Sequence, residues 1–333
     1  MPNLNTSYLG LDLKNPLIAS ASPLTSKCES IKRLEDNGIG AVVMHSLFEE
    51  QINHEQNQLD HFLHNSSESF AEALEYFPND LEFDNIEADD YLNEIEKTKK
   101  SVDIPVIASL NGVSSGGWVK YASKLQGAGA DGLELNITYI PTSLNMSGVE
   151  VENMYIDTIK TVKQNISIPL NLKMNSYFSN PANMAKQFYD AGIDGLTLFD
   201  NPVTVDIDLE DLNSIQKANI TTPKDKSETL RWCAILFNKL NNVSLCANTG
   251  IHNYEDVLKA IMSGADATSF ASILLKNGEQ EIKNILVKLH SWMEEKEYTS
   301  ISQMKGSISL DHTRNPDAYE RNSYIEALQN FRR

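Results

Sequence analysis

Cysteine, basic residues and long hydrophobic runs are all scarce in this chain of 333 residues. The three cysteines, Cys28, Cys233 and Cys246, have no Cys-x-x-Cys spacing. Few and unpaired cysteines are typical of proteins from a reducing compartment, and they supply no thiolate set for an iron–sulfur cluster. We therefore expect a cytoplasmic protein with no cluster of its own.

Charge and hydropathy exclude two further classes of partner. The chain has 28 Lys and Arg against 46 Asp and Glu, a formal net charge of -18. Because binding to a phosphate backbone needs clustered Lys and Arg, nucleic acid is not an expected partner. No apolar run reaches the roughly 18 residues of a membrane span, and Met1–Asn5 lacks the basic and apolar regions of a signal peptide. We expect no membrane association.

Two kinds of binding motif are also missing. The sequence contains no glycine-rich P-loop. His54, His61 and His64 are close in sequence, but no carboxylate or cysteine has ligand spacing with them. We therefore predict no metal site.

What the chain does contain is a four-fold repeat, in which a helix-like stretch ends in a glycine and small residues before a short apolar run. A glycine there lets the chain leave a helix in a left-handed conformation. Such a junction is typical of the bottom turn of a β/α unit, so chemistry is expected at the opposite ends of the strands. The four segments are Asn37–Ala41, Ala128–Gly132, Ala191–Gly195 and Ser263–Ala267.

Short apolar runs alternate with amphipathic stretches eight times, which favours an α/β fold with a closed parallel sheet, the (β/α)8 TIM barrel. The predicted strands are Pro16–Ser20, Ala41–His45, Pro105–Leu110, Gly132–Asn136, Pro169–Met174, Gly195–Phe199, Ser244–Asn248 and Ala267–Phe270. The predicted helices are Lys27–Asn37, Asp89–Val102, Gly117–Gln126, Glu150–Gln164, Pro181–Ala191, Lys226–Leu240, Tyr254–Ser263 and Glu279–Glu295.

Two segments interrupt the alternation, one after the second strand and one after the sixth. Leu47–Ala88 is rich in Glu, Asn, His and Ser, and Asp200–Asp225 contains a predicted short hairpin around Val205–Leu209. Insertions after strand ends commonly build walls over a barrel's site. We predict a single domain over residues 1–333, with a further helix at Ala318–Phe331.

Three polar residues at predicted strand ends are candidates for a site: Asn111, Asn136 and Lys173. A lysine inside an apolar strand must meet an anion or a strong acceptor, because burying its charge unpaired costs several kcal/mol. We favour a ligand atom over an internal ion pair with Glu134 as that partner.

Other strand ends carry small or polar residues with two interpretations each. Ser20, Ala21 and Ser22 either let a flat ligand lie against the backbone or form a tight turn. His45, beside Ser46, is placed for a ligand or a proton donor, although a lone histidine is more often structural. Gly250 and Ser272 follow the last two strands, where barrels often bind phosphate, or they lie in ordinary turns.

Seven segments together resemble the dihydroorotate dehydrogenase family, over essentially the whole chain and in the same order. The nearest branch is the dihydroorotate dehydrogenase-like one, close to the class 1 enzymes. The segments are Asn15–Ile18, Ser46–Ile52, Ile104–Gly112, Leu133–Ile137, Asp206–Leu209, Thr249–His252 and Tyr319–Tyr324.

The resemblance implies an FMN-dependent oxidoreductase that converts dihydroorotate to orotate in pyrimidine biosynthesis. By resemblance, Ser20–Ser22 would line the isoalloxazine and Lys173 would contact its polar edge. The FMN site would further include His45, Ser46, Asn111 and Asn136, with Thr249, Gly250, Ala271 and Ser272 at the phosphate. Substrate would be bound by Asn136, Asp200 and Asn201, and a homodimer is a possible assembly.

The chain departs from the family pattern at several of these positions. Class 1 enzymes carry a catalytic cysteine where this chain has Tyr139, and an asparagine where it has Pro141. Tyrosine has an unperturbed pKa near 10, which makes it a poor base at neutral pH. Tyr139 or Thr138 is the candidate proton-transfer group, with His45 as a second candidate, and Lys173 completes the expected catalytic set.

Further departures concern charge and backbone. His45 stands where the family has lysine, and Asp200 stands where an orotate-binding asparagine is expected and would repel a carboxylate. Thr249 and Ala271 replace glycines, and we expect them to weaken the phosphate nest, because a side chain fits poorly at positive φ. These changes keep open an alternative to a flavin oxidoreductase: a divergent barrel with an altered substrate or a degenerate, non-catalytic flavin site.

Overall fold

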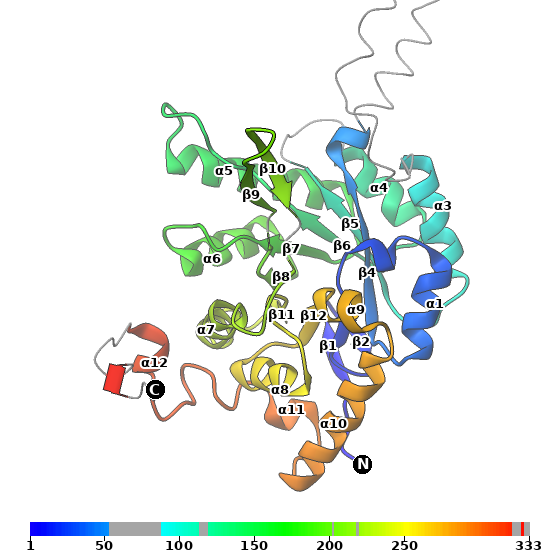
Figure 1. Ribbon diagram of the computed structural model, residues 1–333, viewed down its shortest axis with the longest axis vertical. Helices are drawn as coiled ribbons and strands as arrows, with labels where there is room; N and C mark the ends of the chain where they lie inside the picture. Colours follow the sequence, from blue (N-terminus) through cyan, green and yellow to red (C-terminus); the bar gives the residue numbers. More distant parts are fainter. Residues whose placement is uncertain (53–87, 113–118, 202, 218–219, 322–327, 330–333) are drawn as a thin grey trace, which may run out of the picture.

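In the computed structural model of this chain, eight parallel strands close into a barrel surrounded by helices (Figure 1). The structure describes residues 1–52, 88–112, 119–201, 203–217, 220–321 and 328–329. The barrel order is β11-β12-β3-β4-β5-β6-β7-β8, which confirms the predicted TIM barrel. Its strands are β3 Leu17–Ala19, β4 Ala41–Phe48, β5 Val106–Asn111, β6 Gly132–Asn136, β7 Leu170–Met174, β8 Gly195–Leu198, β11 Ser244–Ala247 and β12 Ala267–Phe270.

The helices alternate with these strands and pack around them (Figure 1). Each of the eight predicted helices has a counterpart, and two match to the residue. Among the described residues the helices are α1 Cys28–Asp36, α3 Ala88–Lys99, α4 Val119–Gly127, α5 Gly148–Asn165, α6 Pro181–Ala191, α7 Lys226–Leu236, α8 Tyr254–Ser263, α9 Ser272–Asn277, α10 Glu281–Glu295, α11 Ile301–Met304, α12 Asp317–Glu320 and the 3-10 turn η1 Pro23–Thr25.

The second insertion contains the predicted hairpin (Figure 1). Its strands, β9 Thr204–Asp208 and β10 Asn213–Lys217, pair antiparallel. Most of the first insertion, residues 53–87 with His54, His61 and His64, lies outside the described residues. Most of the predicted C-terminal helix also lies outside them, and α12 covers only its start.

The glycines of the four-fold repeat have the left-handed backbone that the sequence predicts. Their φ angles are +99° at Gly38, +95° at Gly129, +112° at Gly192 and +121° at Gly264. At Gly264 a Cβ would lie 2.5 Å from the Cβ of Phe237, so the close approach of α7 also requires glycine. The turns at the N-terminal end of the barrel therefore require glycine at these positions.

In the last three repeats the aspartate closes the turn by accepting a hydrogen bond from a main-chain N–H of the preceding strand. Asp194 Oδ2 accepts from Leu170 N at 2.8 Å and contacts Lys163 Nζ at 2.6 Å. Asp131 contacts Val106 N and Lys99 in the same way, and Asp266 contacts Leu245 N and Lys305. Each carboxylate thus satisfies a strand amide that has no ladder partner.

The first repeat has Gly40 where the others have aspartate. Asn15, from outside the repeat, makes the equivalent hydrogen bonds. Asn15 Oδ1 accepts from Leu17 N at 3.0 Å, and Asn15 Nδ2 donates to Gly38 O at 2.8 Å. A Cβ on Gly40 would lie 2.3 Å from Asn15 O, so the two residues depend on each other.

A hairpin that the sequence did not reveal closes the N-terminal end of the barrel. It consists of β1 Thr6–Tyr8 and β2 Leu11–Leu13, which pair antiparallel. Leu9 N donates to Ser244 Oγ at 2.9 Å, and Tyr8, fully buried, has its hydroxyl 3.5 Å from Thr197 Oγ1 inside the barrel. The hairpin therefore closes the inside of the barrel at its N-terminal end.

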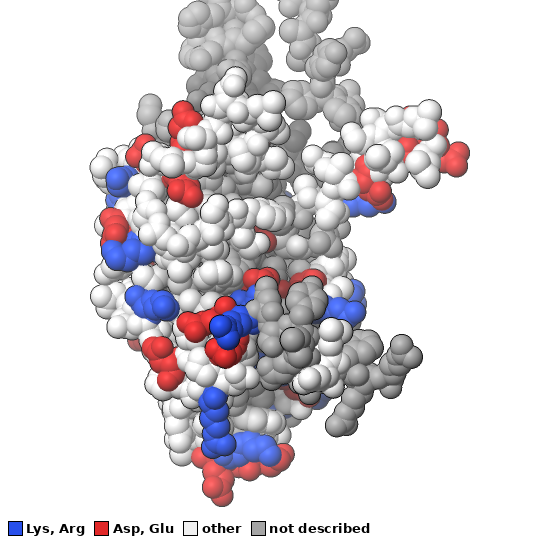
Figure 2. All heavy atoms as spheres, turned by 90° about the vertical axis from the view of Figure 1, so that its left-hand side faces the viewer, with Lys and Arg blue, Asp and Glu red and all other residues white. Residues whose placement is uncertain are grey.

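Figure 2 presents one face of the molecule with its charged side chains coloured. Acidic and basic side chains are interspersed there, with no extended basic patch. Within the described ranges, no helix is both long and apolar enough to cross a membrane.

Candidate functional site

A cavity of about 250 Å³ lies where several barrel strands end at their C-terminal side. It is lined by residues that follow β3, β8, β11 and β12, together with Lys173 on β7. Among them are nine of the residues predicted from the sequence: Ser20, Ala21, Ser22, Lys173, Asp200, Asn201, Thr249, Ala271 and Ser272. The structure thus brings together positions that span most of the chain.

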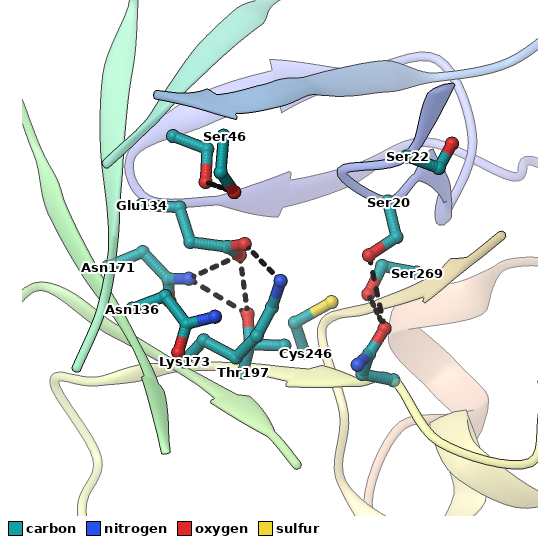
Figure 3. Close-up of polar contacts among 12 residues, drawn as sticks. Ser20, Ser22, Ser46, Glu134, Asn136, Asn171, Lys173, Thr197, Cys246 and Ser269 are labelled. Atoms are coloured by element: carbon teal, nitrogen blue, oxygen red, sulfur yellow. Dashed lines mark hydrogen bonds and ion pairs between the residues drawn. The ribbon is translucent and has the colours of Figure 1, made fainter. Parts of the chain in front are cut away.

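The strongest electrostatic contact of the site is a buried ion pair on two neighbouring strands (Figure 3). Lys173 Nζ on β7 lies 2.7 Å from Glu134 Oε1 on β6, and their side chains are 7% and 3% exposed. The other carboxylate oxygen, Oε2, accepts from Asn171 Nδ2 at 3.0 Å and Thr197 Oγ1 at 3.2 Å. Both oxygens of the buried carboxylate therefore have partners.

The ion pair changes the interpretation of Lys173. The sequence favoured a ligand atom over Glu134 as its anion, and in the structure Glu134 is that anion. Burial alone would lower the pKa of Lys173, but Glu134 and Asp200 raise it above its usual value. Lys173 also lines the cavity, so a charged ammonium can serve both the ion pair and a ligand.

A second carboxylate, Asp200, follows β8 and lies in the wall of the same cavity. Its main-chain N–H donates to Met174 O at 2.8 Å, which fixes the start of the loop. Burial raises the pKa of Asp200, while Lys173 and hydrogen bonds from the Asn201 main chain and the Asn136 side chain oppose that shift. The site therefore contains two carboxylates near one ammonium.

The other side of the cavity is organised around Asn248, which directly follows β11. Its Oδ1 accepts from Ser269 Oγ at 2.8 Å and from Ser20 Oγ at 3.3 Å, as the right side of Figure 3 shows. Its Nδ2 donates to Phe199 O at 2.8 Å. These bonds tie the ends of β3, β8, β11 and β12 together and hold the Ser20–Ser22 turn against the cavity.

The positive φ angles that would exclude a side chain at Thr249 and Ala271 are not found, and a weakened phosphate nest stays a prediction. Ala271 has φ -124°, and Thr249 is not among the described non-glycine residues with positive φ. Gly250 does have φ +77°, but a Cβ there would lie 2.1 Å from Lys226 N. Its glycine is required by packing against the start of α7, and Gly250 does not line the cavity.

Free main-chain donors remain at this end of the cavity. Among the described residues, none accepts a hydrogen bond from the N–H groups of Thr249, Gly250, Ile251, Ala271 or Ser272. All of these except Gly250 line the cavity. Ser272 Oγ accepts from the main chain of Thr221, so that side chain is already engaged. Groups of free amides at strand ends are suited to an anion such as phosphate.

The cavity therefore fits the flavin mononucleotide implied by the sequence resemblance. Small residues at Ser20–Ser22 leave room for a flat ring, and Lys173 supplies a positive charge. The free main-chain amides can donate hydrogen bonds to a phosphate. Within the part of the chain that the structure describes, no three His, Cys, Asp or Glu side chains gather as metal ligands would.

Some predicted residues lie on the same level of the barrel without lining the cavity. Asn111 is paired in register with Asn136, and Asn136 with Lys173, so the three polar strand ends converge as predicted. Ser46 Oγ contacts Ser109 Oγ at 2.8 Å. His45 lies near the Phe48 ring, and burial lowers the pKa of His45, which favours its neutral form.

The two candidate proton-transfer residues differ in their contacts. Thr138 is exposed, and its hydroxyl donates to Asn136 Oδ1 at 3.3 Å. Tyr139 is half-buried, and its hydroxyl donates to Met146 Sδ at 3.3 Å. Thr138 is thus connected to the polar strand ends, whereas Tyr139 is held by its own loop. Their catalytic role stays a prediction.

Sequence reasoning missed Asn171, Thr197, Asn248 and Ser269 as parts of the site. A signal for the first was available, because polar residues alternate with leucines in Leu133–Asn136 and Leu170–Lys173. In a barrel strand such alternate residues share the inner face. The bonds of Asn248 to Ser269 and Ser20 join three strands far apart in sequence, and no local pattern indicates them.

Comparison with known sequences agrees with this geometry. Residues 3–293 match the family described as dihydroorotate dehydrogenase. The chain is similar to three proteins described as "Dihydroorotate dehydrogenase B (NAD(+)), catalytic subunit". That of Thermoplasma acidophilum is 25% identical, covering 92% of this chain and 99% of the relative. Those of Methanocaldococcus jannaschii and Caldicellulosiruptor bescii are 24% and 23% identical, covering 89% and 92% of this chain and 95% and 100% of the relatives.

Proposed function

The chain belongs to the dihydroorotate dehydrogenase family, and on that premise we propose that it is an FMN-dependent oxidoreductase acting on the CH–CH bond of a dihydropyrimidine. The observation that carries the proposal is a single cavity with the Lys173 ammonium and, on its wall, free main-chain amides. The relatives are named for dihydroorotate and for NAD(+).

The proposed cofactor site divides into two parts. The free amides at Thr249–Ile251 and Ala271–Ser272 would hold the phosphate, and Ser20–Ser22 would lie along the ring. Lys173 would contact the polar edge of the ring, held in place by Glu134 at 2.7 Å. When bound, the flavin supplies a hydride acceptor, which side chains do not provide.

The proposed substrate groups lie between β6 and β8. Asn136 and Asn201 would orient the ring by hydrogen bonds, and Asn136 is itself held between Thr138 and Asp200. Thr138 is the better placed of the two candidate proton acceptors, since its hydroxyl already contacts Asn136. A positioned proton-transfer group contributes about 10²- to 10⁴-fold to a rate.

The proposal also covers the setting of the reaction. We propose a small-molecule substrate, a role in pyrimidine biosynthesis and a homodimer, which rest on the family resemblance, and a cytoplasmic location, which rests on the few unpaired cysteines. The three cysteines are free and buried, so a cluster that passes electrons onward would belong to another chain. The name "catalytic subunit" of the relatives supports a second chain.

The test begins with the visible absorption spectrum of purified protein, before and after incubation with FMN and desalting. We expect retained flavin bands that bleach anaerobically when a dihydropyrimidine is added. A protein that fails to retain FMN would contradict the proposal and favour the degenerate barrel.

A charge variant locates the cofactor within the protein. Ala271→Asp places a carboxylate among the free amides and is expected to weaken FMN retention at least tenfold, or about 1.4 kcal/mol. Ser214→Asp, which adds the same charge on the exposed β10 strand, is the matched control. Equal retention by the two variants would place the phosphate elsewhere.

A further inference from the structure

The cavity wall carries one positive and one negative side chain among the described residues, Lys173 and Asp200. The ammonium of Lys173 is already matched by the buried carboxylate of Glu134 at 2.7 Å. Counting the three groups together, two carboxylates accompany one ammonium. The described part of this wall therefore offers no unmatched cation to a carboxylate ligand.

Asp200 is also fixed in place. Its main chain is bonded to Met174 O at 2.8 Å, and its carboxylate accepts from the Asn136 side chain and the Asn201 main chain. These are the two asparagines that the proposed function assigns to substrate. Because Asp200 already accepts from the Asn136 side chain, a substrate carboxylate would compete with it for that donor.

Among the described residues of the cavity wall, the one cation near Asp200 is Lys173, which is already paired with Glu134. His45, within β4, does not line the cavity, and burial lowers its pKa, which favours its neutral form. Two like charges in a partly buried site repel more strongly than in water, because the effective dielectric constant is lower. A substrate carboxylate beside Asp200 is thus disfavoured by the like charge and by competition for a donor, whereas the phosphate of FMN would bind the free amides.

We infer that the substrate is a neutral dihydropyrimidine, a cyclic ureide that lacks the ring carboxylate of dihydroorotate, and that Asp200 is the residue that sets this specificity. The inference rests on the proposed function and deepens it. Oxidation would remove one ring hydrogen as a hydride, which bound FMN would accept, and one proton from the adjacent carbon, which the proton-transfer group would pass to solvent, and the C=C bond would form between the two carbons. The two electrons then pass to an external acceptor, NAD(+) or a dye.

The experiment compares pyrimidine ligands that carry a charged substituent, a neutral substituent or none. Orotate and orotamide have the same ring and nearly the same shape, but the amide is neutral, and uracil lacks the substituent. Binding of each to the FMN-loaded protein is measured by titration calorimetry at pH 7.5. We expect orotamide and uracil to bind at least tenfold more tightly than orotate. Binding of orotate as tight as that of orotamide would overturn the inference.

Substitution then assigns the discrimination to one residue. Asp200→Asn is expected to reduce the orotamide-to-orotate ratio at least tenfold, mainly by strengthening orotate binding. Asp190→Asn, which removes the same charge from an exposed pair on α6, should leave the ratio unchanged. An unchanged ratio in Asp200→Asn would overturn the role of Asp200.

Failure of the proposed function has a different result. A protein that retains no FMN contradicts the function and the inference together. A protein that retains FMN and prefers orotate contradicts only the inference. If Asp200→Asn does not fold, the ligand series with the unchanged protein still decides the substrate class.

Discussion

The two ends of this barrel satisfy their polar groups in opposite ways. At the N-terminal end Asp131, Asp194 and Asp266 each accept a strand amide and pair with a lysine, and these pairs are partly exposed. At the C-terminal end Lys173 and Glu134 are nearly fully buried, and main-chain donors next to the cavity have no partner among the described residues. The first arrangement is complete without a ligand, and the second is not.

The difference separates structural from functional polarity. A repeated contact that recurs in the same form at each turn stabilises the fold and needs no ligand. A contact that occurs once, in a buried position with free donors nearby, has a cost that a ligand can offset. The same kinds of side chain, carboxylates and lysines, thus serve different purposes at the two ends.

The largest expected effect comes from breaking the buried pair. Lys173→Met leaves Glu134 uncompensated and is expected to reduce the free energy of unfolding by about 3–5 kcal/mol. Lys163→Met breaks the partly exposed pair with Asp194 and should cost about 0.5–1 kcal/mol. Denaturant unfolding of both variants measures the difference, and equal losses would contradict the comparison.

A double variant separates stability from cofactor binding. Lys173→Met with Glu134→Gln removes both buried charges, so much of the lost stability should return. FMN retention, measured by absorbance after desalting, should stay low because the ammonium is still missing. Recovery of FMN retention would show that Lys173 acts only through folding.

The second expected effect concerns proton transfer. Thr138→Val removes the hydroxyl that contacts Asn136 and should lower kcat about 100-fold. Tyr139→Phe removes a hydroxyl that contacts Met146 and should change kcat less than about threefold. Single-turnover reduction of the bound flavin measures both rates, and the reverse order would assign the proton transfer to Tyr139.

The third effect probes the N-terminal end alone. Gly264→Ala combines φ +121° with a contact of 2.5 Å to Phe237, and we expect a loss of about 2 kcal/mol in stability. FMN affinity of the folded protein should not change. Gly148→Ala, where nothing lies within 4 Å of the added carbon, is the control. A large loss of FMN affinity in Gly264→Ala would mean that the two ends are coupled.

The smallest effect is a pH dependence at Asp200. Burial raises the pKa of this acid in the folded state, so its ionisation destabilises the fold above that pKa. The cost shrinks as the pH falls below the folded-state pKa and is gone below the unfolded-state pKa. Asp200→Asn should therefore be more stable than the unchanged protein at pH 8, with a gain that shrinks toward acidic pH. Thermal unfolding at several pH values measures the difference in stability between the two proteins. A gain that grows on acidification would contradict the assignment.

Local sequence patterns predict most of the fold but only part of the candidate site. The repeat glycines and aspartates are adjacent in sequence, so the N-terminal turns could be predicted, except for Asn15, which replaces an aspartate from about 25 residues away. The polar strand ends Asn111, Asn136 and Lys173 could be predicted because strand ends meet at one mouth. The choice of Glu134 as the partner of Lys173 could not be predicted, because it depends on the register between β6 and β7.

Hydrogen–deuterium exchange with and without FMN tests the contrast between the two ends most directly. The account predicts that FMN slows exchange in peptides covering residues 19–23, 247–252 and 270–274. Exchange should stay unchanged at the N-terminal turns, residues 191–195 and 263–267. Protection at those turns in place of the C-terminal strand ends, or protection at neither, would contradict the assignment of the cavity as the flavin site.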